Sequence, residues 1–250
     1  MSKWFLKSRA SVEPKLRIFL FPYAGASAHI FNDWHQYFQT DIDVFSVQSP
    51  GRAERFGEEP ITNLSEMTNQ LLSEITNYID IPYIFIGHSN GAFIAFDLSQ
   101  KLQASENSNL KHLILSGISS PQQKPEFFIS NLRKKEIDMM LERYSKIPSL
   151  IKNNENILNA FMPLILADFG LTDGYQFDFT KKIKTNLSLF IGKLDIPYHP
   201  EIRPFPWARL IEGSTSIFHF ESGHFFIDDE RDLFISRVQQ LVTKELETLF

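Results

Sequence analysis

The chain has 250 residues, of which 43% are hydrophobic and 22% are charged, and its formal net charge is −5. This composition is typical of a folded globular protein and excludes a disordered or fibrous chain. The absence of cysteine excludes disulfide scaffolds, thiolate metal sites, iron–sulfur clusters and cysteine nucleophiles. The acidic balance argues against nucleic acid or an anionic membrane surface as a partner.

The N-terminal segment has features of both a targeting signal and a strand. Basic residues from Lys3 to Arg17 precede the apolar run Ile18–Phe21, as in a signal peptide. We favour a buried strand, because Pro22 follows only four strongly apolar residues. No apolar run reaches the roughly 18 residues that cross a bilayer. The sequence therefore predicts a cytoplasmic protein with no membrane partner.

Six short apolar runs rich in Ile, Val and Phe predict buried strands. They are Leu16–Phe21, Ile42–Val47, Tyr83–Ile86, His112–Ser116, Leu187–Ile191 and Ser216–Phe220. Apolar residues have helical spacing over Leu64–Ile79, Ala92–Leu102 and Arg231–Leu249. Continuous apolar strands that alternate with helices predict one α/β domain over residues 1–250, with a mostly parallel sheet and helices on both faces.

The stretch 121–169 departs from this alternation, because it has helical patterns and no convincing strand. It is either a helical excursion that packs on the body or a lid over an apolar pocket. Insertions at the strand ends of open α/β sheets lie where ligands bind. Because a nucleophile motif follows an earlier strand, we favour the lid.

That motif is Gly87-His88-Ser89-Asn90-Gly91, which follows the strand Tyr83–Ile86 and runs into a helical pattern. A serine on a tight strand-to-helix turn projects its hydroxyl from the sheet edge, and small residues on either side let the turn pass close to neighbouring backbone. The helix directs its positive N-terminal end at the site. The flanking elements favour Ser89 as a nucleophile.

A serine nucleophile needs a base, which in this architecture follows the serine and the acid in the chain. His112 and His219 lie inside predicted strands, where a buried, hydrogen-bonded structural histidine is the commoner explanation. His199 lies in a loop and stays possible. His224 fits best, because it lies between the last predicted strand and the terminal helix. His219 and His224 match no strong helical metal motif and have no evident third ligand, so we expect no metal. A serine nucleophile with a histidine base needs no cofactor, and we expect none.

The acid should lie in a loop after a strand and before the histidine. Asp195 meets this condition, since it follows the strand Leu187–Ile191. Its role would be to hold the imidazole tautomer and stabilise the imidazolium. Asp168 and Asp173 are rivals, but no strand directly precedes either residue.

An oxyanion hole should use the backbone N–H of Asn90, the residue after the nucleophile. A second donor should come from the loop after an early strand. The segment Pro22–Ser27 is that loop, and it offers Tyr23 or Ala24 as the donor. The alternative is a plain Gly/Ala turn.

With these residues in place, the chain resembles the type II thioesterases that accompany nonribosomal peptide and polyketide synthases. The resemblance runs from about Leu16 to Phe226. The motifs that carry it are Phe21–Ser27, Gln48–Arg52, Gly87–Ala92, Leu166–Phe169 followed by Tyr175, Gly192–Asp195 and Gly223–Phe226. The chain has Tyr23 where the family often has His, Ala26 where it often has Gly, and Asn90 where it often has Met.

The resemblance implies an α/β-hydrolase fold with a helical lid. The implied activity is hydrolysis of acyl thioesters from the phosphopantetheine arms of carrier proteins, through Ser89, His224 and Asp195 and an acyl-enzyme. The alternatives are a carboxylesterase or lipase that acts on oxyesters, and a non-catalytic small-molecule binder. We expect a monomer.

The segment from Lys124 to Lys152 is basic, with seven Lys or Arg against four Asp or Glu. Such a run is usually a solvated helix face. The resemblance gives it another interpretation, since carrier proteins are typically acidic around the phosphopantetheine serine. The segment therefore indicates a docking surface for an acidic carrier protein.

Overall fold

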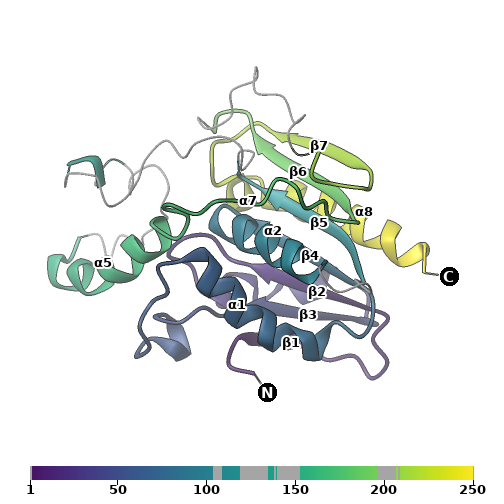
Figure 1. Cartoon of the computed structure of the whole chain (residues 1–250), viewed down its shortest axis with the longest axis horizontal. Coiled ribbons are helices and arrows are strands. Elements are labelled where there is room, and N and C mark those ends of the chain that lie inside the picture. Colours follow the sequence, from purple (N-terminus) through teal and green to yellow (C-terminus); the bar gives the residue numbers. More distant parts are fainter. Residues whose placement is uncertain are drawn as a thin grey trace.

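The computed structural model describes residues 2–103, 109–118, 135–137, 139, 153–195, 207 and 209–249. At its centre lies a seven-stranded sheet with the order β1-β3-β2-β4-β5-β6-β7 (Figure 1). The strands are β1 (Phe5–Arg9), β2 (Leu16–Phe21), β3 (Ile42–Val47), β4 (Tyr83–His88), β5 (Leu110–Ser116), β6 (Asn186–Gly192) and β7 (Thr215–Phe220). Only β1 is antiparallel to its neighbour. The expected mostly parallel sheet is confirmed.

Helices cover both faces of this sheet. The described α-helices are α1 (Leu64–Ile75), α2 (Asn90–Leu102), α5 (Glu155–Phe169), α7 (Phe226–Asp229) and α8 (Arg231–Glu247). In Figure 1, α1 and α2 lie in front of the sheet and α8 lies behind it. Short 3-10 helices occupy Ala28–Phe31, Trp34–Tyr37, Ala53–Arg55 and Thr76–Tyr78. The helix expected over Leu64–Ile79 thus ends at Ile75 and continues as a 3-10 turn.

Alternate residues of the strands build two separate cores, as the two-residue period of a strand dictates. In β2, Phe19 and Phe21 pack in the core beneath α1 and α2. Leu16, Ile18 and Leu20 pack in the opposite core, against α8. Both faces of β2 are therefore buried, which explains its continuous apolar sequence.

The edge strand β1 is absent from the strands that the sequence predicts. Its sequence Phe5–Arg9 holds only two apolar residues, and the burial pattern is mostly intermediate. Lys7 pairs with the buried Asp43 at 2.9 Å and lies over the Phe45 ring. The register shifts between Lys7 and Arg9. Charged side chains and irregular register are typical of edge strands, and they hide the alternating pattern.

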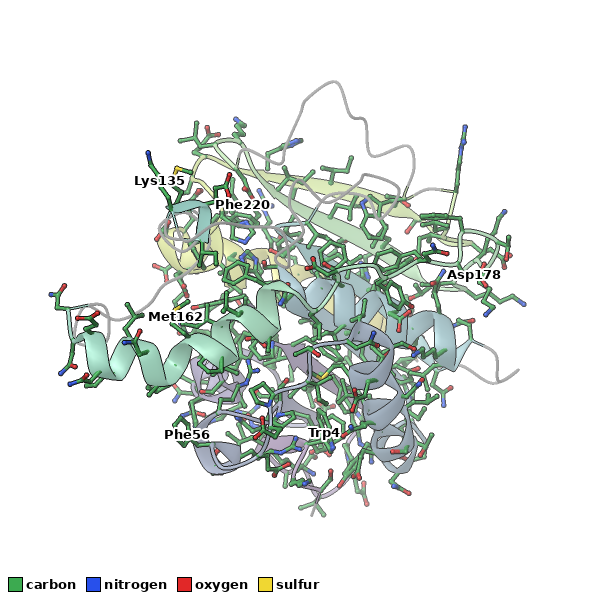
Figure 2. All side chains as sticks on the ribbon, turned by 60° about the vertical axis from the view of Figure 1, so that its left-hand side comes forward. Trp4, Phe56, Lys135, Met162, Asp178 and Phe220 are labelled. Carbon is green, nitrogen blue, oxygen red and sulfur yellow. The ribbon has the colours of Figure 1, made fainter. Side chains whose placement is uncertain are left out.

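Helix α5 projects away from the sheet (Figure 1). Most side chains from Glu155 to Ala160 are exposed, whereas Leu164, Ile165, Ala167 and Asp168 are buried. Phe161 contacts Phe56, with ring centroids 5.7 Å apart, and Figure 2 shows Phe56 and Met162 at this end of the molecule. This helix confirms the helical pattern over 155–169. The rest of the expected lid falls largely outside the described residues.

None of the helices in the described part of the chain is long and apolar enough to cross a bilayer.

Candidate active site

Ser89 occupies a strained turn between β4 and α2. Its backbone has φ 54° and ψ −122°, a combination that costs a non-glycine residue about 1–3 kcal/mol. A Cβ added at Gly87 would lie 2.4 Å from the carbonyl oxygen of Gly91, and one at Gly91 would lie 2.1 Å from that of Phe21. Only glycine fits at these two positions. Ser89 itself is partly exposed, so its hydroxyl is within reach of a ligand.

His224 lies between Ser89 and Asp195. Its Nε2 is 3.0 Å from the Ser89 Oγ, and its Nδ1 is 2.8 Å from the Asp195 Oδ2. The side chains of His224 and Asp195 are each 7% exposed, so little water screens the bond between them. A carboxylate accepts only, so the bond to Asp195 selects the tautomer with its proton on Nδ1, in which the unprotonated Nε2 accepts from the serine hydroxyl.

The loops that carry Asp195 and His224 follow β6 and β7 and are bonded to each other. The Leu194 N–H donates to the Ser222 carbonyl at 3.1 Å. A Cβ at Gly192 would lie 2.6 Å from the Gly223 oxygen, so glycine allows this close approach. Ser222 donates to Glu230 through its backbone N–H at 2.7 Å and through its hydroxyl. These hydrogen bonds lower the pKa of Glu230 below its ordinary value.

The loop after β2 forms a tight turn. The Ala26 N–H donates to the Tyr23 carbonyl at 3.1 Å, and Gly25 has φ +77°, as a type II turn requires at its third position. The Gly25 N–H donates to the Asp168 Oδ2 at 2.6 Å. Gly25 and Ala26 thus have acceptors, which leaves the amides of Tyr23 and Ala24 as the candidate oxyanion donors of this turn.

Asn90 begins α2 directly after Ser89. Its side-chain amide donates to the backbone carbonyl of Asp168. The polar group that distinguishes this chain from the expected methionine is therefore engaged by α5. The backbone N–H of Asn90 lies in the first turn of the helix, where donors have no intrahelical acceptor.

Tyr23 connects the same turn to the histidine loop. Its hydroxyl donates to the Asp228 Oδ2 at 3.2 Å, and its ring packs edge-on against Phe225. Burial and the nearby Asp228 carboxylate raise the pKa of Tyr23 well above its ordinary value. The phenol is therefore a neutral donor at all pH values at which the protein is expected to work.

The remaining histidine candidates have different surroundings. His112 is buried and bonds both Glu245 and Ser188 at 2.8 Å, so its structural role is confirmed. His219 is exposed on β7, and the expectation of a buried residue is wrong because β7 is an edge strand. His199 lies outside the described residues.

Of the three aspartates considered, Asp195 is the one whose carboxylate bonds the Nδ1 of His224 in the described part of the chain. Asp173 lies in the turn after α5, where its N–H donates to the Gly170 carbonyl. Asp168 forms a buried ion pair with Arg52, in which two N–H groups donate at 2.8 Å each.

The sequence analysis placed Arg52 and Asp168 in motifs of the family resemblance, but it gave Arg52 no role and considered Asp168 as a rival for the acid. A signal was present, because Asp168 interrupts the apolar run from Phe161 to Phe169. A carboxylate on an apolar helix face needs a buried partner. Spacing does not identify that partner, since Arg52 lies 116 residues earlier.

Within the described residues, no group of three or more His, Asp or Glu side chains is arranged to hold a metal ion.

A profile of the thioesterase domain matches residues 16–241. The chain belongs to the thioesterase family. The gramicidin S biosynthesis protein GrsT of Aneurinibacillus migulanus is 30% identical over 92% of this chain and 90% of its own length. The chain is therefore a thioester hydrolase.

Solved structures of thioesterases share its fold. The type II thioesterase BorB from the borrelidin biosynthetic cluster superposes with a TM-score of 0.83 at 22% identity, over 99% of this chain and 97% of BorB. YbtT, a type II thioesterase from the yersiniabactin NRPS/PKS pathway, also gives 0.83 at 22% identity, over 97% of this chain and 99% of YbtT. The expected α/β-hydrolase fold and the resemblance to type II thioesterases are confirmed.

Proposed function

We propose that Ser89, His224 and Asp195 are the catalytic triad of an editing thioesterase that hydrolyses acyl groups from carrier proteins. The observation that carries this proposal is the continuous line of hydrogen bonds from Ser89 through His224 to Asp195. It lies at the carboxyl ends of parallel strands, where open α/β sheets bind ligands.

In the first half of the reaction, the Ser89 Oγ attacks the thioester carbonyl carbon while the His224 Nε2 takes the hydroxyl proton. The tetrahedral intermediate collapses, the C–S bond breaks, and His224 returns the proton to the leaving thiolate. Asp195 stabilises the imidazolium through its bond to Nδ1. The products of this half are a free thiol and an acyl ester on Ser89.

In the second half, His224 takes a proton from a water molecule, and the resulting hydroxide attacks the acyl-enzyme carbonyl. Collapse breaks the ester bond, and the proton passes to the Ser89 Oγ. The reaction consumes one water and releases a carboxylic acid. The backbone N–H of Asn90, together with that of Tyr23 or Ala24, would stabilise the negative oxygen in both intermediates.

The proposed substrates are acyl thioesters on the phosphopantetheine arm of an acyl or peptidyl carrier protein. Both BorB and YbtT are type II thioesterases of biosynthetic gene clusters or pathways, and GrsT takes its name from gramicidin S biosynthesis. The same proposal includes a single domain, a monomer working in the cytoplasm, and a lid over residues 121–169. The exposed first turns of α5 and its projection from the sheet (Figure 1) favour a lid.

The test of the triad uses single and paired substitutions. Ser89→Ala and His224→Ala should each lower kcat by about 10⁴–10⁶-fold, and the double variant should be little worse, because the residues act as a unit. Asp195→Asn should lower kcat by about 10³–10⁴-fold through the wrong imidazole tautomer. Full activity in a folded Asp195→Asn variant would contradict the assignment of the acid.

A panel of substrates distinguishes the proposed activity from the alternatives. Acyl-carrier thioesters should be turned over with higher kcat/KM than free oxyesters of the same acyl group. A preference for oxyesters would instead indicate a carboxylesterase or lipase. A fluorophosphonate probe should label Ser89 rapidly in the wild type and leave Ser89→Ala unlabelled, whereas no labelling of the wild type would indicate a non-catalytic binder.

A further inference from the structure

The Arg52–Asp168 ion pair lies between the two loops that carry the proposed oxyanion donors. Arg52 is 6% exposed and Asp168 is 4% exposed, and the contact is bidentate, with both N···O distances at 2.8 Å. Stability alone does not account for so buried a pair, since apolar replacements of such pairs are often neutral or stabilising. The surroundings of the pair point to a positioning role.

Both members of the pair hydrogen-bond to the backbone of the turn after β2. The Asp168 Oδ2 accepts from the Gly25 N–H at 2.6 Å, and the Arg52 Nη1 donates to the Ala26 carbonyl at 3.1 Å. An N–H and a carbonyl from consecutive residues are thus fixed by opposite charges. Because Gly25 directly follows Ala24, these bonds set the direction of the neighbouring amides in the turn.

Asp168 also contacts the second loop. Its backbone carbonyl accepts from the side-chain amide of Asn90, the residue whose own N–H is the other proposed oxyanion donor. Asp168 therefore bonds both segments that carry the proposed oxyanion donors, the turn after β2 and Asn90. It lies in the last turn of α5, so the position of that helix is coupled to both loops.

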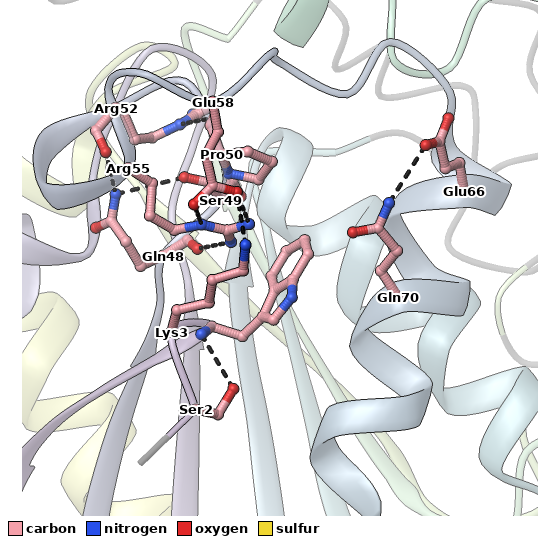
Figure 3. A network of polar contacts seen from close by, with 11 residues as sticks. Ser2, Lys3, Gln48, Ser49, Pro50, Arg52, Arg55, Glu58, Glu66 and Gln70 are labelled. Carbon is pink, nitrogen blue, oxygen red and sulfur yellow. Dashed lines mark hydrogen bonds and ion pairs between the residues drawn. The ribbon is translucent and has the colours of Figure 1, made fainter.

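Arg52 is itself held by a network of polar contacts on its far side (Figure 3). The Gln48 side chain donates to the Arg52 carbonyl at 3.0 Å and accepts from the Ala28 N–H at 2.9 Å. Arg55 donates to the Gln48 carbonyl at 2.8 Å, forms an ion pair with Glu58 and lies over the Trp4 ring. The guanidinium of Arg52 is thereby presented to Asp168 from a fixed loop.

We propose that Asp168, oriented by Arg52, is a positioning residue for the oxyanion hole. It acts through its bonds to the Tyr23–Ala26 turn and to Asn90. Because Asp168 belongs to α5, the geometry of the oxyanion hole depends on the position of this helix. This inference rests on the proposed function for its catalytic consequence, while the hydrogen bonds that it invokes are a property of the fold.

The experiment compares wild type, Asp168→Asn and a matched control in the full chain. Asp43→Asn is the control, because Asp43 is also buried and also accepts from a backbone N–H, of Ser11, and from a cation, Lys7. Asp43 lies near the start of β3, at the end of the sheet remote from Ser89. Both variants should lose stability, but only Asp168→Asn should affect the hole.

For Asp168→Asn we expect kcat with an acyl-pantetheine thioester to fall about 10–100-fold. This is less than the loss of about 10²–10³-fold that follows removal of an oxyanion donor, because the donors are misplaced and not removed. KM should stay within about threefold, since the hole acts on the developing charge. The affinity for an alkyl boronic acid, which forms a tetrahedral anion on Ser89, should fall by the same factor as kcat. Amide exchange at Gly25 should become at least about tenfold faster, because its acceptor has lost its charge.

A double variant separates positioning from stability. In Asp168→Asn, the guanidinium of Arg52 is a buried cation without its carboxylate. Adding Arg52→Gln removes this cation, so the double variant should have a higher unfolding midpoint than Asp168→Asn alone. Its kcat should nevertheless remain low. Recovery of kcat together with stability would overturn the proposal, as would unchanged Gly25 exchange in Asp168→Asn, or kcat and boronate affinity within twofold of wild type. If the wild type lacks thioester turnover but binds the boronate, the proposed function fails, and the exchange and boronate measurements still decide this inference.

Discussion

At Ser89, backbone strain and glycine neighbours are parts of the same arrangement. The positive φ of Ser89 directs its hydroxyl out of the sheet edge towards His224. Packing of α2 against β2 holds this conformation, and it requires the first turn of the helix to approach the carbonyl of Phe21 closely. A side chain at Gly91 would therefore disturb the helix, the turn and the amide of Asn90 together.

Gly91→Ala tests this requirement. The added Cβ would lie 2.1 Å from the Phe21 carbonyl oxygen and 2.7 Å from that of Pro22, and backbone atoms cannot rotate away. We expect the free energy of unfolding to fall by at least about 1–3 kcal/mol and kcat to fall as well. The control is Gly57→Ala, where nothing lies within 4 Å, and its effect should stay within about 0.5 kcal/mol. Urea unfolding measures both, and equal stability of the two variants would contradict the close approach.

The candidate site could be predicted where local sequence determines it. The turn around Ser89 and the placement of His224 after β7 follow from glycines and strand ends that adjoin each residue in the chain. The Arg52–Asp168 pair and the bond from Asn90 to α5 could not be predicted, because they join segments that only the fold brings together. Spacing within one segment contains no information about such contacts.

Among the elements, α8 is attached to the sheet by a buried polar cluster as well as by its apolar stripe. His112 of β5 bonds Glu245 of α8 at 2.8 Å and Ser188 of β6 at 2.8 Å. The Asn186 side chain also donates to Glu245, at 2.9 Å. Burial opposes the ionisation of Glu245, but the bonds from His112 and Asn186 prevail and lower the pKa of Glu245 below its ordinary value.

This shift gives the attachment a definite pH dependence. A lowered pKa means that the contribution of Glu245 is fully present above its unfolded pKa, about 4.3, and is lost as the pH falls through the lower folded value. Glu245→Gln should therefore reduce the free energy of unfolding by about 1–3 kcal/mol at pH 7, and the difference from wild type should shrink below about pH 4.3.

Urea unfolding at pH 7, 5 and 3.5 measures this difference. Glu247→Gln is the matched control, since Glu247 is an exposed carboxylate on the same helix, and it should change stability by at most about 0.5 kcal/mol. A Glu245→Gln deficit that grows as the pH falls would show that the ionised form is not the stabilising one.

The elements themselves differ in how far the sequence determines them. Strands β2 and β3 begin and end where the apolar runs do, because burial on both faces leaves few polar residues within them. The edge strand β1 has a mixed sequence, because one of its edges has no neighbouring strand in the described sheet and because Lys7 forms an ion pair with Asp43. The antiparallel pairing of β1 with β3, a long-range contact, could not be predicted from such a segment.

At the scale of the whole molecule, charge is distributed unevenly along the chain. The segment 124–152 has a net charge of +3 in a chain of −5. Within it, Lys135 is exposed, and its side chain points away from the body (Figure 2). A basic surface raises the rate of association with an acidic partner more than it raises the affinity of the final complex. If this segment serves carrier docking, its charge should affect large substrates and spare small ones.

The last prediction tests this by charge reversal. Changing Arg133, Lys134 and Lys135 to Glu should raise the apparent KM for an acyl-carrier protein about tenfold, by slowing a steered encounter. The KM for an acyl-pantetheine thioester should hardly change, because that substrate has no acidic domain. The control reverses three exposed lysines, Lys181, Lys182 and Lys184, which precede β6 at the end of the sheet remote from Asp195. It carries the same change in net charge and should leave both KM values unaltered.

Salt provides an independent measurement of the same effect. The preference of the wild type for the carrier-bound substrate should decrease between 0.1 M and 1 M salt, as the Debye length falls from about 10 Å to about 3 Å. The variant with residues 133–135 reversed should have little preference for the carrier-bound substrate, and salt should therefore change its preference little. If that variant instead impairs the carrier and pantetheine substrates equally, the segment serves the fold or the substrate site, and docking through its charge is excluded.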